Sequence, residues 1–333
     1  MTTQVSADAT PAIHTPLLRR LPAFPPWGAA LIGALLVAVV IAVSNDAFLT
    51  PRNLSNIFAQ TAVLVILATG QTFVMITAGI DLSVAAVGAL SATLLGVLTV
   101  ANDLPWSLSL LICLLVGAVI GALHGVLVGR VLLPAFIVTL GGLLVWRGAA
   151  LQLTGGINTT GLPDPIRWLG RGLIAGVPVP AVIAVLVAAI SAIVIVKTKF
   201  GVGLRAIGGS EGAAARAGVP VLRYRITAYI ICSMLACLGG IMLAGRLDSA
   251  GGNLAQGFEL QVIAAAAIGG VSLFGGTGSP VGAFFGAILI GLIQNGMNLG
   301  GVSPFIQQIV SGAILVLAVG VDQFRKYLAR RIS

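Results

Sequence analysis

A few polar side chains interrupt the long apolar stretches of this sequence, and they are the residues that could bind a small solute. Gln294 and Asn298 are four residues apart, so a helix would place them on one face. Amide side chains both donate and accept hydrogen bonds, which suits neutral hydroxylated solutes. Hydrogen bonding between packed helices is the alternative role for these side chains and for the other candidates. The other candidates for a polar pathway are Gln71, Thr72, Ser83, His124 and Thr139.

Asp81 is the acidic residue whose position most invites a functional interpretation. It lies in a short polar turn between two apolar stretches. An acid inside a membrane commonly marks a proton or ion pathway, so Asp81 could couple transport to an ion gradient. We favour a structural interpretation, in which Asp81 and Ser83 cap the free amides of the helix that follows.

The residue patterns of enzymes do not occur in this sequence. None of the three lysines follows a glycine, so the sequence has no phosphate-binding loop for ATP. The two histidines, His14 and His124, are far apart and have no cysteine or acid at metal-binding spacing. No nucleophile lies beside a candidate base. We therefore predict a chain that is not an enzyme and that holds no cofactor or metal of its own.

The composition indicates a membrane protein. Of 333 residues, 58% are hydrophobic and 8% are charged, against about 25% charged in ordinary soluble domains. Windows of about 20 apolar residues, enough to cross a bilayer, recur along the chain. We predict an all-α bundle of about ten transmembrane helices, which is compatible with a five-plus-five inverted repeat. The predicted spans are 27–44, 57–78, 83–101, 107–129, 134–154, 178–196, 226–245, 260–274, 281–297 and 305–321.

The basic residues predict the orientation. Thirteen fall at 19–20, 130, 197–225 and 325–331, whereas four fall on the alternate loops. Cytoplasmic loops of membrane proteins are rich in Lys and Arg, so both termini are predicted to be cytoplasmic. The net charge of +9 thus reports topology rather than a nucleic-acid partner. The predicted organisation is an N-terminal tail (1–26), a polytopic domain (27–321) and a basic C-terminal tail (322–333), without a separate soluble domain.

Residues 208–220 form a long polar interruption within the cytoplasmic segment 197–225. Ser210 can cap a helix, and Glu211 in the first turn suits the helix dipole. Gly218 stops the helix and Pro220 prevents its continuation. The result is a short helix with almost no side chain larger than alanine, suited to a groove on another protein. A solvated turn is the alternative.

Four ordered stretches together resemble a known family: 70–84, 134–141, 208–220 and 259–278. They are similar to the sugar permeases of ATP-binding-cassette importers, of the ribose/xylose/galactose type. The resemblance implies a subunit of the bacterial inner membrane that works as a homo- or heterodimer. Its partners would be cytoplasmic ATPase subunits, which bind the ATP, and a periplasmic solute-binding protein. The implied coupling helix comprises Ser210, Glu211, Gly212, Ala213, Ala214, Arg216 and Gly218, with Glu211 and Arg216 as the charged contacts.

Two positions depart from the pattern of this family. Ala78 stands where glycine is common, and His124 stands where asparagine is usual. The second difference changes the polar surroundings of the predicted pathway. The function we predict is a permease subunit for a monosaccharide or similar small polar solute. The alternative is an ion-coupled carrier or facilitator that acts alone, with Asp81 as its coupling acid.

Overall fold

The computed structural model describes residues 25 and 27–332, with side chains described to residue 320 and at Gln323. The predicted N-terminal tail therefore lies, except for Pro25, outside the described residues. The helices are α1 (Gly28–Ser44), α2 (Pro51–Ile76), α3 (Val84–Gly96) with a π-helical turn (Val97–Ala101), α4 (Trp106–Gly129), α5 (Ala135–Thr154), α6 (Asp164–Arg171), α7 (Val179–Lys197), α8 (Lys199–Gly209), α9 (Glu211–Arg216), α10 (Val221–Leu247), α11 (Phe258–Ile268), α12 (Pro280–Leu299) and α13 (Pro304–Ile332).

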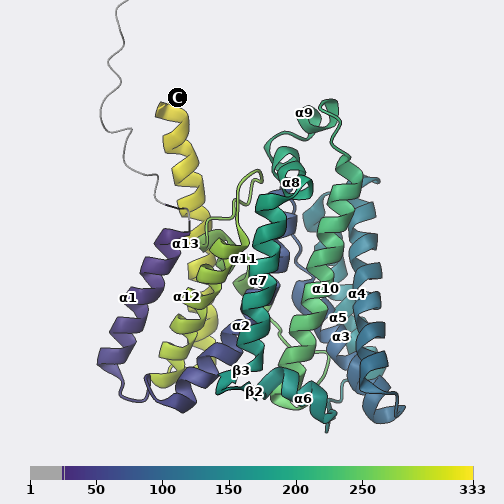
Figure 1. Cartoon of the computed structure of the whole chain (residues 1–333), viewed down its shortest axis with the longest axis vertical. Coiled ribbons are helices and arrows are strands. Elements are labelled where there is room, and N and C mark those ends of the chain that lie inside the picture. Colours follow the sequence, from purple (N-terminus) through teal and green to yellow (C-terminus); the bar gives the residue numbers. More distant parts are fainter. Residues whose placement is uncertain (1–24, 26, 333) are drawn as a thin grey trace, which may run out of the picture.

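The long helices run side by side along one direction, and short elements close the two ends (Figure 1). Helices α8 and α9 lie at the same end as the C-terminal end of α13. At the opposite end lie α6 and the antiparallel pair β2 (Leu173–Ile174) and β3 (Val177–Pro178). A second antiparallel pair joins β1 (Thr159–Thr160) to β4 (Ser249–Ala250).

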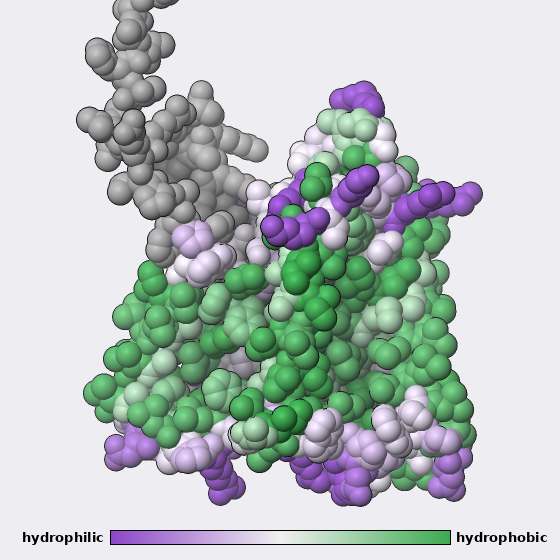
Figure 2. Space-filling view, viewed as in Figure 1, coloured by the Kyte–Doolittle hydropathy of each residue, from purple (hydrophilic) through white to green (hydrophobic). Residues whose placement is uncertain are grey.

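The predicted all-α membrane bundle is confirmed at this level. Within the described residues, seven helices are long and apolar enough to cross a membrane: α2, α3 with its π-helical turn, α4, α5, α7, α10 and α12. Apolar side chains form a belt around the middle, between polar residues at both ends (Figure 2). The other three predicted spans coincide with shorter apolar helices, α1, α11 and residues 304–320 of α13. Ten crossings and an inverted repeat therefore stay predictions.

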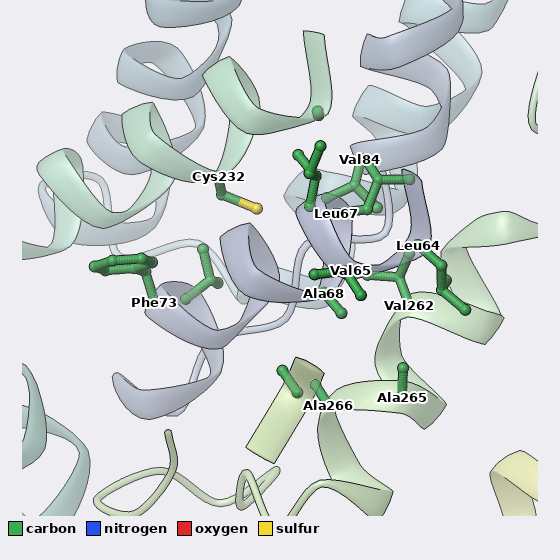
Figure 3. Close-up of a cluster of buried hydrophobic side chains, with 14 of the residues drawn as sticks. Leu64, Val65, Leu67, Ala68, Phe73, Val84, Cys232, Val262, Ala265 and Ala266 are labelled. Carbon is green, nitrogen blue, oxygen red and sulfur yellow. The ribbon is translucent and has the colours of Figure 1, made fainter. Parts of the chain in front are cut away.

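The core of the bundle surrounds α2. All of its residues from Thr61 to Ile76 are buried, polar side chains such as Gln71 included, so this part of the helix has no lipid- or water-facing side. It packs against α7, α10, α11 and α12. Figure 3 shows side chains of α2 beside those of α3, α10 and α11, namely Leu64, Val65, Leu67, Ala68, Phe73, Val84, Cys232, Val262, Ala265 and Ala266.

Four glycines of α4, spaced four residues apart, form its contact surface for α10. Gly117, Gly121, Gly125 and Gly129 face α10, the helix with which α4 has its most extensive contact. A Cβ added at Gly121 would lie 2.5 Å from the carbonyl oxygen of Tyr229. Since no side chain fits there, the two backbones approach closely, as small residues allow in membrane bundles.

Several element boundaries differ from the prediction for local reasons. The second span begins earlier, at Pro51, because Thr50 accepts a hydrogen bond from the Asn53 amide and caps α2. The eighth ends earlier, at Ile268. The cytoplasmic segment contains an unexpected helix, α8, which Thr198 caps and which buries Leu204 and Ile207. The backbone of the predicted C-terminal tail continues α13 to Ile332.

Candidate functional site

The tip of the 197–225 segment has the architecture predicted for it. Helix α9 lies at the outer end of the bundle, beyond α8 and level with the C-terminal end of α13 (Figure 1). The Ser210 hydroxyl accepts a hydrogen bond from the Ala213 amide at 3.3 Å, so Ser210 is the predicted N-cap. Gly218 has φ = +81°, a left-handed conformation that ends the helix. The helix is six residues long and lies between the N-cap at Ser210 and the left-handed Gly218.

The outer surface of α9 is small and open. Gly212, Ala213 and Arg216 are exposed, whereas Ala214 is buried against the bundle. Within the described part of the chain, no ion pair of the Arg216 guanidinium is seen. A surface of glycine and alanine with one free cation can enter a narrow groove that carries a complementary acid.

Glu211 is held by a residue that the sequence analysis did not identify. The two guanidinium nitrogens of Arg225 donate to the Glu211 carboxylate at 2.7 and 3.2 Å. The Arg225 side chain is 10% exposed and that of Glu211 is 50% exposed. This bidentate pair joins α9 to α10. Because the partners are 14 residues apart, no helical spacing could have revealed the pair.

The 197–225 segment rests directly on the end of α2. The Ile76 carbonyl accepts a hydrogen bond from the Gly276 amide at 2.9 Å, and Gly208 of α8 contacts the same carbonyl. A side chain at Gly208 would collide with both Ile76 and Gly276. Helix α8 therefore packs against the residue that immediately precedes the 77–83 turn.

Asp81 is fully buried in this turn. One carboxylate oxygen, Oδ1, accepts hydrogen bonds from the Ser83 amide at 2.8 Å and the Ser83 hydroxyl at 2.6 Å. The predicted cap is thus only partly right. Asp81 closes its own turn, whereas the Ser83 side chain donates to Asp81 and does not cap α3. The other oxygen, Oδ2, has no hydrogen-bond partner among the described residues.

Two predicted pathway residues hold the backbone of the same turn. With its amide oriented to satisfy both groups, Gln71 of α2 donates to the Asp81 carbonyl at 3.2 Å and accepts from the Asp81 amide at 3.0 Å. The single hydroxyl proton of Thr139 in α5 is shared between the Ile80 carbonyl at 3.1 Å and the Ala135 carbonyl of its own helix at 2.9 Å. Thr72 takes no part, because its hydroxyl donates to Ala68 within α2 at 2.8 Å.

His124 brings α4 into the same network. Its Nδ1 lies 4.0 Å from Asp81 Oδ2, and its Nε2 accepts a hydrogen bond from Trp146 Nε1 of α5 at 3.2 Å. The Tyr229 ring of α10 meets the imidazole edge-on, with ring centroids 6.5 Å apart. Residues of four helices, α2, α4, α5 and α10, thus converge on the turn that holds Asp81. The sequence analysis singled out neither Trp146 nor Tyr229.

Comparison with known proteins identifies the family. A family model described as the permease component of a branched-chain amino acid transport system matches residues 53–319. The chain belongs to this permease family. The ribose import permease protein RbsC of Bacillus subtilis is 38% identical over 294 residues, which cover 88% of this chain and 91% of that protein. The D-allose transport system permease protein AlsC of Escherichia coli is 34% identical over 298 residues, covering 89% and 91%. No solved structure matches the chain.

The predicted resemblance to ribose- and xylose-type permeases is therefore confirmed. A xylose transport system permease protein of Escherichia coli is also 31% identical over 359 residues, covering 87% of this chain and 91% of that protein. A permease component of this kind is a multi-pass membrane subunit of a bacterial importer, and it transports rather than catalyses. Such subunits depend on ATPase and binding-protein partners and carry no cofactor of their own.

The amide residues of the permease lie away from the Asp81 turn, in the other half of the bundle. Gln294 of α12 accepts a hydrogen bond from Gln60 of α2 at 3.4 Å, and Asn298 accepts one from Gln307 of α13 at 2.8 Å. Between α11, α12 and α13 is a small enclosed pocket lined by Gln261, Gln294 and Ser311, among others. The structure thus separates the predicted polar residues into two groups, an amide group and a group around Asp81.

Proposed function

We propose that this permease imports a monosaccharide or a similar small polar solute. The ribose, allose and xylose permeases among its relatives support a sugar, although the family description names amino acids. The amide group supports the same proposal, because neutral Gln and Asn side chains exchange hydrogen bonds with hydroxyl groups without favouring a charge. We assign the solute pathway to Gln294, Asn298 and the pocket beside them. To the residues around Asp81, which form the other polar group, we assign the role of holding the 77–83 turn.

The transport cycle is driven, in this proposal, through α9. Its position at the outer end of the bundle, with an exposed surface of small residues, is the observation that carries the proposal. Ser210, Gly212, Ala213, Ala214 and Gly218 shape the helix, and Arg216 supplies the charge that pairs with an acid in the groove of an ATPase subunit. Glu211 contributes by holding α9 to α10 through Arg225. ATP is bound by the partner.

The remaining parts of the assembly follow from this arrangement. The permease would cross the inner membrane ten times, with both termini in the cytoplasm. The position of α9 at the same end as the C-terminal end of α13 supports this orientation. A second permease copy, identical or not, would complete the pathway, and a periplasmic binding protein would deliver the solute at the opposite end, beside α6.

The experiment is purification of the tagged permease in mild detergent from its own host, with identification of the proteins that accompany it. We expect an ATPase subunit, and we expect it to be lost from Arg216→Glu. The matched control is Arg223→Glu, the same charge reversal at an exposed residue of α10 on the same side. Retention of the ATPase by Arg216→Glu at the level of Arg223→Glu would refute the coupling role of α9.

The ion-coupled carrier predicts the opposite result. A permease that purifies alone and accumulates sugar in ATP-free vesicles under an ion gradient would overturn the importer proposal. Asp81 would then be the residue to examine. Its complete burial and its bonds to Ser83 instead suit a structural carboxylate, and the family of the chain favours the importer.

A further inference from the structure

The contacts of His124 determine which of its nitrogens carries the proton. An indole N–H donates hydrogen bonds and cannot accept them. Because Trp146 Nε1 points at His124 Nε2 at 3.2 Å, Nε2 must offer its lone pair. A neutral imidazole then carries its proton on Nδ1, the nitrogen that faces Asp81 Oδ2 at 4.0 Å. Neither of these two facing atoms has a hydrogen-bond partner among the described residues.

The surroundings of His124 favour the neutral form over the charged one. The imidazole is 2% exposed, so it has no solvent to stabilise a positive charge. A second proton on Nε2 would also place two donors against each other and take from the half-buried Trp146 N–H its acceptor. The carboxylate of Asp81 acts in the opposite direction. The other described ionisable side chains nearby belong to α10. Tyr229 and Cys232 supply no positive charge, and Arg225, one helical turn from Tyr229, is paired with the Glu211 carboxylate.

We propose that His124 is a positioning residue, fixed by Trp146 as the neutral tautomer protonated on Nδ1. The Nδ1–H donates to Asp81 Oδ2, either directly once the two atoms move closer than 4.0 Å or through one bridging water. This bond holds the 77–83 turn to α4. Gln71 and Thr139 hold the backbone of the turn from α2 and α5. The 77–83 turn follows the end of α2 on which the coupling segment rests. His124 therefore stabilises the turn through which the coupling segment contacts the interior of the bundle.

The tautomer can be measured directly, because the chain has only two histidines, His14 and His124. The protein is labelled with ¹⁵N-histidine in the full-length chain, and a His14→Gln variant leaves the signals of His124 alone. We expect Nδ1 to be the protonated nitrogen and the spectrum to stay unchanged across the interval of about pH 5 to 8 in which free histidine titrates. Protonation on Nε2, or titration of His124 within that interval, would overturn the proposal.

A second variant tests the role of the indole. Trp146→Phe keeps an aromatic ring but removes the N–H that engages Nε2. We expect the His124 signals of this variant to show both tautomers or to titrate, because the constraint on Nε2 is gone. If the signals match those of the unaltered chain, the indole does not fix the tautomer and the proposal fails in this part.

The importance of the Nδ1 proton for transport is tested by three substitutions. This part alone rests on the proposed function. His124→Asn keeps an N–H donor close to the position of Nδ1, His124→Gln moves its amide to the position of Nε2, and His124→Leu has no donor. We expect the Asn variant to keep most of the ATP-driven sugar uptake and the Gln and Leu variants to lose about tenfold. Equal uptake by the Asn and Leu variants would refute the role. If the unaltered chain shows no ATP-driven uptake, the proposed function fails while the tautomer result stands.

Discussion

Two short segments between long helices lie near the α8–α9 end of this permease, and they are built in different ways. The backbone of α9 is capped locally, where Ser210 accepts from the amide three residues later, most of its side chains are exposed, and the Glu211–Arg225 ion pair joins it to α10. In the 77–83 turn the Asp81 carboxylate is fully buried and accepts from Ser83 within the turn, while Gln71 of α2 holds the Asp81 backbone and His124 of α4 faces the carboxylate. The first segment is organised for contact with another molecule. The second is held by its own bundle.

The largest effect that this comparison predicts is at Asp81. Asp81→Ala removes the acceptor of two hydrogen bonds and leaves the Ser83 amide without a partner in the interior. We expect the whole bundle to lose about 3 kcal/mol of stability, because buried bonds to a charged group are strong and costly to leave unmade. The measurement is the thermal-unfolding midpoint in detergent.

Asp81→Asn is the matched control for this change. Its carbonyl oxygen can still accept from Ser83, so we expect the loss to be about 1 kcal/mol. Equal midpoints for the Ala and Asn variants would show that the charge, not the acceptor, stabilises the turn. A midpoint for Asp81→Ala close to that of the unaltered chain would contradict the view that the bundle holds this turn.

The link between α9 and α10 predicts the next largest effect. Glu211→Gln leaves the nearly buried Arg225 without its anionic partner. Since Glu211 itself is half exposed, solvent screens the pair, and we expect a loss of about 1–2 kcal/mol. Arg225→Gln in the Glu211→Gln background should add little, because the interaction has already been removed. A double-mutant cycle on the unfolding midpoint measures this coupling, and strictly additive losses would show that the pair contributes nothing.

The cap of α9 predicts a smaller and local effect. Ser210→Ala removes the acceptor for the Ala213 amide, which typically costs about 1 kcal/mol. We expect hydrogen exchange of the amides at 211–216 to speed up about fivefold, while the unfolding midpoint of the bundle stays the same. Ser210→Asp keeps an acceptor and serves as the control. A fall in the midpoint for Ser210→Ala would mean that α9 belongs to the folding unit of the bundle.

The same contrast explains what could be predicted from the sequence. The caps and stops of α9 are local signals, so Ser210 and Gly218 were identified with their correct roles. The glycines of α4 recur every four residues in the sequence, so a close contact with another helix can be predicted from them. The sequence does not indicate that this helix is α10. Glu211–Arg225 and His124–Trp146 join residues 14 and 22 positions apart. Such pairs depend on how helices are placed relative to one another, and no spacing within one helix records that.

Ala78 provides the smallest and most discriminating test. Its φ of +61° is left-handed, a conformation that costs an L-residue about 1–2 kcal/mol and costs glycine almost nothing. This explains why glycine is common at this position in the family that the sequence resembles. Ala78→Gly removes the strain but increases the entropy lost on folding by about 0.5–1 kcal/mol, so we expect a net gain of about 0.5–1 kcal/mol.

The control for this gain is Ala175→Gly, at an exposed hairpin residue with φ = +49° at the other end of the bundle. Similar increases in the unfolding midpoint for both variants would mean that neighbouring elements hold the 77–83 turn and that Ala78 merely tolerates its conformation. A loss for Ala78→Gly alone would assign stability to the contact between its methyl group and the adjoining Gly275. The turn would then depend on its own side chains, as α9 does, and the two segments would differ less than their burial suggests.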